Sequence, residues 1–173
     1  EGRLGDIREC TGANVCIWKE EDFRHIGCIQ NATAGEEFRR GWHPETFEPA
    51  ADPAKSILVV GAGPAGMEAA MVLGKRGFSA VHLVDRHDAI GGRITWTRRL
   101  PTLGDWGRIA DWRTTQLVAL ANVEVITGRE LDGSDILDYG AQLVIIATGS
   151  HWCDDGTQPG TLKPVLGAAG SLT

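Results

Sequence analysis

The sequence predicts an α/β fold built on a parallel sheet, and three observations support this prediction. Short apolar runs rich in β-branched residues recur along the second half of the chain, each ending at a glycine or a polar residue. Segments with helical spacing of apolar residues separate these runs. The first run leads directly into a glycine-rich turn. Strands that alternate with helices form crossover units, which give a parallel sheet covered on both faces.

The predicted strands and helices follow one another without a long gap. Residues 56–60 are expected to form a buried first strand, because the run is continuously apolar after its serine. Apolar residues at helical spacing from Met67 to Gly74 predict a helix, with Gly77 as its C-cap. The later elements are expected at 80–84 (strand, ending at Asp85), 105 to about 121 (helix), 123–127 (strand), 134–139 (helix) and 143–147 (strand).

Composition divides the chain into four parts. Residues 1–47 show little periodicity and hold three of the four cysteines, so we expect an irregular segment there. Residues 48–55 combine prolines with small residues, which is typical of a linker. Residues 56–150 form the predicted sheet domain, and residues 151–173 are expected to be a loop-rich tail. Because the chain begins with Glu1 and stops without a closing element, we expect a fragment or a processed chain.

Charge and hydropathy exclude several classes of partner. Lysine and arginine total 17 against 23 acidic residues, a formal charge of −6, whereas nucleic acids and anionic membranes attract clustered basic residues. No apolar run approaches the length of a membrane span, and the start resembles neither a signal peptide nor a lipidation motif. We therefore expect a cytoplasmic protein that binds neither nucleic acid nor membrane.

A glycine-rich turn predicts a nucleotide site. Residues 61–66 match G-x-G-x-x-G, and the match has weight because it leaves a predicted strand and opens a predicted helix. Gly61 permits the tight turn, Gly63 lets the backbone approach a pyrophosphate, and Gly66 lets helix and strand pack closely. Pro64 and Ala65 begin the helix, whose free N–H groups and positive dipole end attract phosphates. The turn indicates binding of ADP or a dinucleotide.

Asp85 is the candidate for ribose recognition. It ends the second predicted strand, 19 residues after Gly66, where a carboxylate can accept hydrogen bonds from both ribose hydroxyls. The alternative is a helix-capping or surface aspartate. Arg86 could indicate a 2′-phosphate, but beside Asp85 we interpret it as a solvated surface residue.

Three cysteines in the first segment form a candidate metal site. Cys10, Cys16 and Cys28 have the short spacings that let one loop ligate several corners of an iron–sulfur cluster. We do not expect these cysteines to form a disulfide framework, because the rest of the sequence has the features of a cytoplasmic enzyme fragment. The alternative is that these cysteines are small buried hydrophobes, and the distant Cys153 is interpreted as an unrelated thiol.

Two loops and the cysteine segment resemble known flavoproteins. Gly91-Gly92-Arg93 and residues 145–149 resemble loops that flank the nucleotide in flavoproteins with two dinucleotide-binding domains, which implies roles for Gly92 and Arg93. Nearly the whole chain is similar to the trimethylamine/dimethylamine dehydrogenase family, old-yellow-enzyme-type relatives of 2,4-dienoyl-CoA reductase. The similar stretches are 10–16, 30–37, 39–45, 59–66, 139–141 and 145–149.

The resemblance also implies a particular ligand pattern with one departure. That family carries C-x-x-C-x-x-C and a fourth cysteine about a dozen residues later, and the four positions fall on Cys10, Ala13, Cys16 and Cys28. Alanine cannot coordinate iron. Three outcomes stay open, namely a three-iron cluster, a four-iron (4Fe-4S) cluster with a foreign ligand, and no stable cluster.

The family's architecture implies what this chain lacks. The resemblance implies a flavin (FMN) barrel before residue 1, a second nucleotide domain after residue 173, an electron-transfer flavoprotein as acceptor and a homodimer. Substrate oxidation would occur on the barrel flavin, so no catalytic residue is expected in this chain. What remains is an electron-transfer and ADP- or FAD-binding portion of an oxidoreductase. An FAD- and NAD(P)H-dependent reductase and a non-enzymatic ADP-binding module are the alternatives.

Overall fold

The computed structural model describes residues 2–41, 46–150, 157 and 163. Most of the predicted tail, including Cys153, lies outside the described residues. Residues 48–55, predicted to be a linker, contain neither helix nor strand. No helix in the described ranges combines the length and apolar character required to cross a membrane.

Four parallel strands form one sheet, which confirms the predicted fold class. They are β1 (Ser56–Val60), β2 (Ala80–Val84), β3 (Val123–Ile126) and β4 (Leu143–Ile146), in the spatial order β3-β2-β1-β4. The register pairs Val60 with Val84 on one side and with Ile146 on the other, so the carboxyl ends of three strands are level. The third and fourth strands end one residue earlier than predicted.

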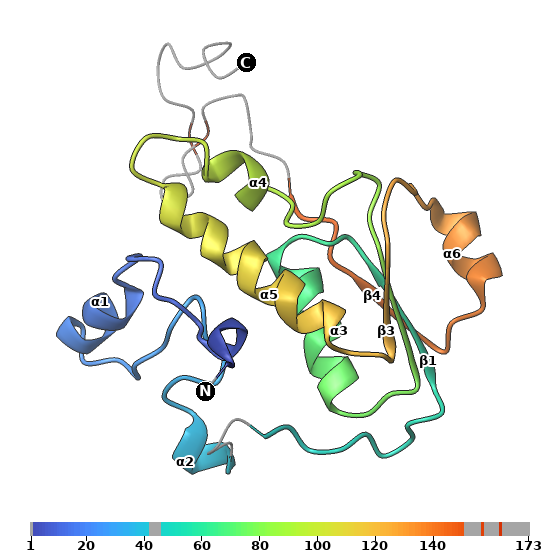
Figure 1. Cartoon of the computed structure of the whole chain (residues 1–173), viewed down its shortest axis with the longest axis horizontal. Coiled ribbons are helices and arrows are strands. Elements are labelled where there is room, and N and C mark those ends of the chain that lie inside the picture. The colour runs from blue at the N-terminus through green and yellow to red at the C-terminus, as the bar shows by residue number, and fades with distance from the viewer. Residues whose placement is uncertain (1, 42–45, 151–156, 158–162, 164–173) are drawn as a thin grey trace.

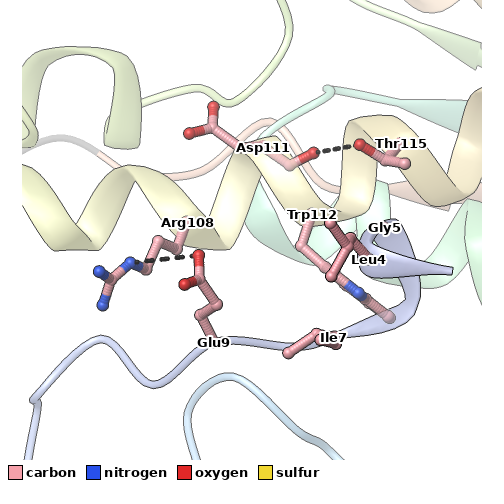
Figure 2. A pocket seen from close by; sticks show the side chains of 8 residues that line it. All are labelled: Leu4, Gly5, Ile7, Glu9, Arg108, Asp111, Trp112 and Thr115. Atoms are coloured by element: carbon pink, nitrogen blue, oxygen red, sulfur yellow. Dashed lines mark hydrogen bonds and ion pairs between the residues drawn. The ribbon is translucent and has the colours of Figure 1, made fainter. Parts of the chain in front are cut away.

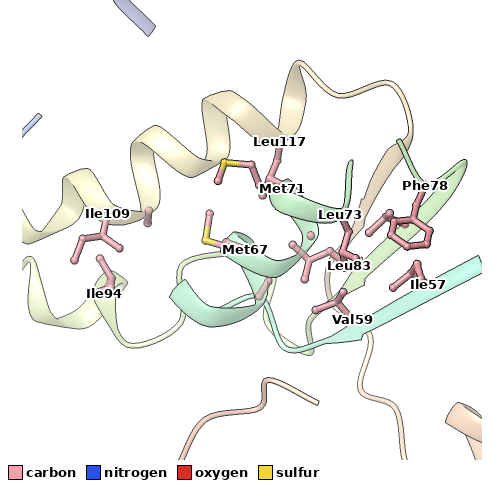
Figure 3. Close-up of a cluster of buried hydrophobic side chains, with 14 residues drawn as sticks. Ile57, Val59, Met67, Met71, Leu73, Phe78, Leu83, Ile94, Ile109 and Leu117 are labelled. Atoms are coloured by element: carbon pink, nitrogen blue, oxygen red, sulfur yellow. The ribbon is translucent and has the colours of Figure 1, made fainter. Parts of the chain in front are cut away.

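Helices cover both faces of the sheet, as the alternating pattern predicted (Figure 1). Helices α3 (Pro64–Lys75) and α5 (Arg108–Val118) lie on one face, and α6 (Gly133–Tyr139) lies on the other. Figure 3 shows Met67 and Met71 of α3 pointing toward α5 above the strand side chains. The opposite face of the strands packs under α6 through Leu58, Val60 and Val84, because successive strand side chains point to opposite faces.

The first segment is less irregular than predicted. It contains η1 (Leu4–Asp6), α1 (Val15–Glu21) and α2 (Glu37–Arg40), and Cys16 lies on α1. Neither η1 nor α1 buries any of its residues, so no apolar periodicity marks them in the sequence.

Two departures from the predicted boundaries lie between β2 and β3. The structure adds α4 (Ile94–Thr97), a single turn too short to show a helical pattern. The helix predicted from residue 105 begins as the 3₁₀ turn η2 (Gly104–Gly107) and its α-helical part ends at Val118. A turn then leads the chain into β3, with the N–H of Leu120 donating to the carbonyl of Leu117.

Candidate functional site

A groove of about 900 Å³ lies at the carboxyl ends of β1, β2 and β4. In open parallel sheets this crevice is the usual ligand site. Gly66 is buried beneath the groove instead of lining it. The other seven of the eight cofactor-site residues predicted from the sequence line the groove: Gly61, Gly63, Pro64, Ala65, Asp85, Gly92 and Arg93.

Two glycines of the turn are required by the chain's own backbone. Gly61 has φ +101°, and a Cβ there would lie 2.5 Å from the carbonyl oxygen of Ala147 at the end of β4. A Cβ on Gly66 would lie 1.8 Å from the carbonyl oxygen of Gly61. Both glycines therefore let α3 start directly against the sheet.

Gly63 is different, because nothing in the described structure requires a glycine there. Its φ of −73° and ψ of −179° are extended values that any residue adopts. The nearest atom to an added Cβ is the Cα of Gly92, at 4.0 Å, which is an ordinary contact. Since Gly63 lines the groove, its missing side chain leaves room for a ligand to approach the backbone.

Replacing Gly63 with alanine is therefore expected to weaken ADP binding without changing stability. The added methyl group would occupy space in the groove that a bound diphosphate needs, whereas its nearest protein atom, the Cα of Gly92, lies at an ordinary 4.0 Å. We expect affinity to fall by about tenfold, equivalent to about 1.4 kcal/mol, with an unchanged melting temperature. Calorimetric titration with ADP and thermal unfolding measure the two quantities. A Gly63→Ala protein with native affinity would contradict a phosphate position at this turn.

The N-terminus of α3, which follows this turn, has the features of a helix end that can bind an anion. Pro64 occupies the first helical position, no side chain caps the end, and the first turn contains no acidic residue. The unpaired N–H groups of a first turn and the positive end of the helix dipole favour a phosphate.

Asp85 lies at the end of β2 with its side chain only 10% exposed. The N–H of Ala62 donates to Oδ2 at 2.6 Å, and the N–H of His87 donates to Oδ1 at 2.9 Å. The Nδ1 atom of His87 lies 2.9 Å from the same Oδ1. Burial raises the pKa of the Asp85 carboxyl, but these hydrogen bonds outweigh burial and hold the pKa below its ordinary value. Asp85 is thus a carboxylate acceptor at neutral pH, already fixed by the turn that it faces.

Basic residues dominate the rest of the groove. Arg86, Arg93 and Arg129 line it, against a single further acidic residue, Glu130, which lies 3.5 Å from Arg86. Arginine side chains are well suited to phosphate groups. Arg129 was not predicted from the sequence. It follows β3, and it reaches the groove because β3 lies beside β2 in the sheet. Its backbone N–H donates to the carbonyl of Asp85.

The three cysteines of the first segment are free and exposed. The N–H of Gly12 donates to Sγ of Cys10, and the N–H of Gln30 donates to Sγ of Cys28, both at 3.3 Å. Within the described ranges, no three His, Cys, Asp or Glu side chains lie close enough to hold a metal ion. Thiolates are the ligands that iron–sulfur clusters use, so the donor chemistry fits such a cluster, although the thiols are not gathered around one ion.

Fold and groove together define the class of protein. The pattern that describes the NAD(P)-binding Rossmann-like domain family matches residues 59–152, more than half of the chain, and the chain belongs to this family. The matched range contains the glycine-rich turn, Asp85 and the loop after β4.

Similarity over the whole chain points to the flavoprotein amine dehydrogenases. Dimethylamine dehydrogenase from Hyphomicrobium sp. (strain x) is 48% identical over 179 residues, covering 99% of this chain and 24% of that protein. Histamine dehydrogenase from Rhizobium sp. 4-9 superposes with a TM-score of 0.88 at 44% identity, over 94% of this chain and 23% of that one. The 6-hydroxypseudooxynicotine amine oxidase of Pseudomonas geniculata N1 superposes with a TM-score of 0.87 at 43% identity. This match covers 94% of this chain and 24% of that one. The chain is homologous to the dimethylamine and histamine dehydrogenases and spans about a quarter of their length.

Proposed function

We propose that this chain binds the ADP moiety of ADP or FAD and forms the nucleotide-binding, electron-transfer portion of an amine dehydrogenase-like flavoprotein. The groove at the carboxyl edge of the sheet supports this proposal most directly. Its lining includes Gly63, the uncapped N-terminus of α3 and the nearly buried carboxylate of Asp85. The similarity to enzymes named as amine dehydrogenases supports the oxidoreductase part.

Each part of the groove has a distinct role in this proposal. The first-turn N–H groups of α3 and the guanidinium of Arg93 bind the diphosphate, and Gly63 lets it reach the backbone. Asp85 accepts a hydrogen bond from a ribose hydroxyl through the Oδ2 lone pair that Ala62 leaves open, because the backbone N–H and the Nδ1 atom of His87 already contact Oδ1. In this proposal the chain orients the nucleotide, and oxidation of the amine takes place on the barrel flavin outside this chain.

Replacing Asp85 with alanine is expected to weaken ADP binding by about 1–3 kcal/mol, since a charge-assisted hydrogen bond is lost. Isothermal titration with ADP measures this change. Asp138→Ala is the matched control, because Asp138 is an exposed carboxylate on α6 outside the groove. Equal ADP affinity in the Asp85→Ala and native proteins would refute the ribose assignment.

We further propose that Cys10, Cys16 and Cys28 hold an iron–sulfur cluster. When bound, the cluster would carry single electrons between a flavin and an external acceptor, and Ala13 would leave one corner without a protein thiolate. In the intact protein this part would work with an FMN barrel, a second nucleotide domain, an electron-transfer flavoprotein and a second subunit.

Anaerobic reconstitution with iron and sulfide is expected to give a centre that loses iron readily to a chelator. The Ala13→Cys variant is expected to hold about four irons and to resist the same chelator, because a fourth thiolate displaces the foreign ligand. Iron and sulfide content and the paramagnetic signal measure both. Identical content and signal in the two proteins would show that residue 13 does not face a cluster.

An FAD- and NAD(P)H-dependent reductase is the second candidate, favoured by the match to an NAD(P)-binding family. A yellow protein that is purified with FAD and bleached by NADPH would support it over the ADP-binding proposal. A chain that binds ADP but takes up neither iron nor flavin would instead be a structural nucleotide-binding module.

A further inference from the structure

One buried guanidinium connects the cysteine segment to the sheet domain. Arg113 of α5 is 4% exposed, and its Nε donates to Oε2 of Glu68 on α3 at 2.7 Å. Its Nη1 donates to Oε1 of Gln30 at 2.8 Å and to the carbonyl of Ile109 at 2.9 Å, while Nη2 donates to the carbonyl of Gln30 at 3.1 Å. The guanidinium thus contacts α3, its own helix and the cysteine segment at once.

Gln30 extends this network to both cysteine loops. It is 2% exposed, and its backbone N–H donates to Sγ of Cys28 at 3.3 Å. Its side-chain Nε2 donates to the carbonyl of Glu9 at 3.4 Å, next to Cys10 in the sequence. A single residue therefore contacts the loops that carry two of the three cysteines.

An amide is the side chain that this position requires. Arginine only donates hydrogen bonds, so it needs an acceptor from residue 30, whereas the carbonyl of Glu9 needs a donor. The amide of Gln30 supplies the oxygen to one and the N–H to the other. A glutamate side chain at position 30 would keep the contact with Arg113 and lose the hydrogen bond to Glu9. An alanine side chain would lose both of these contacts.

A second arginine on α5 holds the first loop from the other side. Nη1 of Arg108 donates to the carbonyl of Cys10 at 2.5 Å, and its Nε lies 3.6 Å from a carboxylate oxygen of Glu9, a pair drawn in Figure 2. A further contact between this segment and α5 lies away from the cysteines: Nε2 of Gln116 donates to the carbonyl of Gly5 at 3.2 Å.

We propose that Gln30 and Arg113 are positioning residues that hold the Cys10 and Cys28 loops together on α5. Through Glu68 they connect these loops to α3, the helix whose N-terminus lies at the nucleotide groove. The proposal concerns the placement of the loops, and only its iron measurement rests on the proposed cluster.

Hydrogen–deuterium exchange of the 173-residue chain tests the placement. In Gln30→Ala, amides in residues 9–12 and 28–34 are expected to exchange about tenfold faster or more, since each loop loses the hydrogen bond that the Gln30 side chain makes. In Gln30→Glu, residues 28–34 are expected to stay protected, while 9–12 exchange fast because two oxygens face each other. In both Gln30 variants, hydrogen exchange in strand β1 and the affinity for ADP are expected to match the native protein. In the control Gln116→Ala, exchange at both loops is expected to be native as well.

The same proteins are then reconstituted anaerobically with iron and sulfide. The visible absorption of the bound cluster per chain is expected to fall at least about twofold in Gln30→Ala and to match the native value in Gln116→Ala. Native exchange at both loops in Gln30→Ala, or equal loosening by Gln116→Ala, would overturn the positioning role. If no protein takes up iron, the cluster proposal fails, and the exchange result still decides the role of Gln30.

Discussion

Replacing Arg113 with methionine is expected to lower the free energy of unfolding by about 3–5 kcal/mol, the cost of removing one partner of a buried ion pair. The carboxylate of Glu68, 19% exposed, would lose the donor to its Oε2, and Oε1 already has no hydrogen-bond partner among the described residues. The side-chain oxygen of Gln30 would lose its donor as well. Urea denaturation followed by circular dichroism measures the change.

A double variant distinguishes the loss of the Arg113–Glu68 ion pair from the loss of packing by the arginine side chain. In the double variant Arg113→Met with Glu68→Met, both charges are absent, and replacing a buried ion pair by apolar side chains is often neutral or stabilising. We therefore expect the double variant to be more stable than Arg113→Met alone. A single variant that loses less than about 1 kcal/mol would show that solvent screens the pair as it screens surface ion pairs.

The Gly66→Ala substitution is expected to cost about 3 kcal/mol of stability and to abolish measurable ADP binding. Its Cβ would lie 1.8 Å from the carbonyl oxygen of Gly61 and 3.3 Å from the Cβ of Ala147. The closest neighbour is backbone at the start of the turn, so α3 must move away from the sheet, and overpacking of this kind costs about 1–3 kcal/mol or more. Moving α3 also displaces the N–H groups that face the groove.

Gly133→Ala is the matched control for this prediction. Gly133 is the first residue of α6, and a Cβ there would meet no atom within 4 Å. Because alanine is the better helix former, the control is expected to be as stable as the native protein or slightly more stable. Thermal unfolding and calorimetric ADP titration of both variants provide the comparison. Native stability in Gly66→Ala would contradict the tight approach of α3 to the carbonyl of Gly61.

The sequence by itself determined the sheet and the turn beside the groove. The bounds of β1 and β2 are confirmed as predicted, because β1 is apolar after its serine and β2 is interrupted only by His82, so the local pattern suffices to mark both strands. The glycine-rich turn and Asp85 were recognisable because their spacing is local to one strand–helix–strand unit. The helical spacing of Ile109, Ala110 and Leu117 likewise predicted the buried face of α5.

Only the tertiary structure decided which distant polar groups meet. The partners Arg113 and Gln30 are 83 residues apart, and each alone has the pattern of an ordinary surface residue. Arg129 enters the groove because β3 lies beside β2, and α1 forms although it buries none of its residues. Apolar periodicity reports which face of an element is buried, whereas hydrogen-bond partners depend on how the elements pack. The residues that line the groove were therefore largely predictable from the sequence, and the contacts that join the cysteine loops to α5 were not.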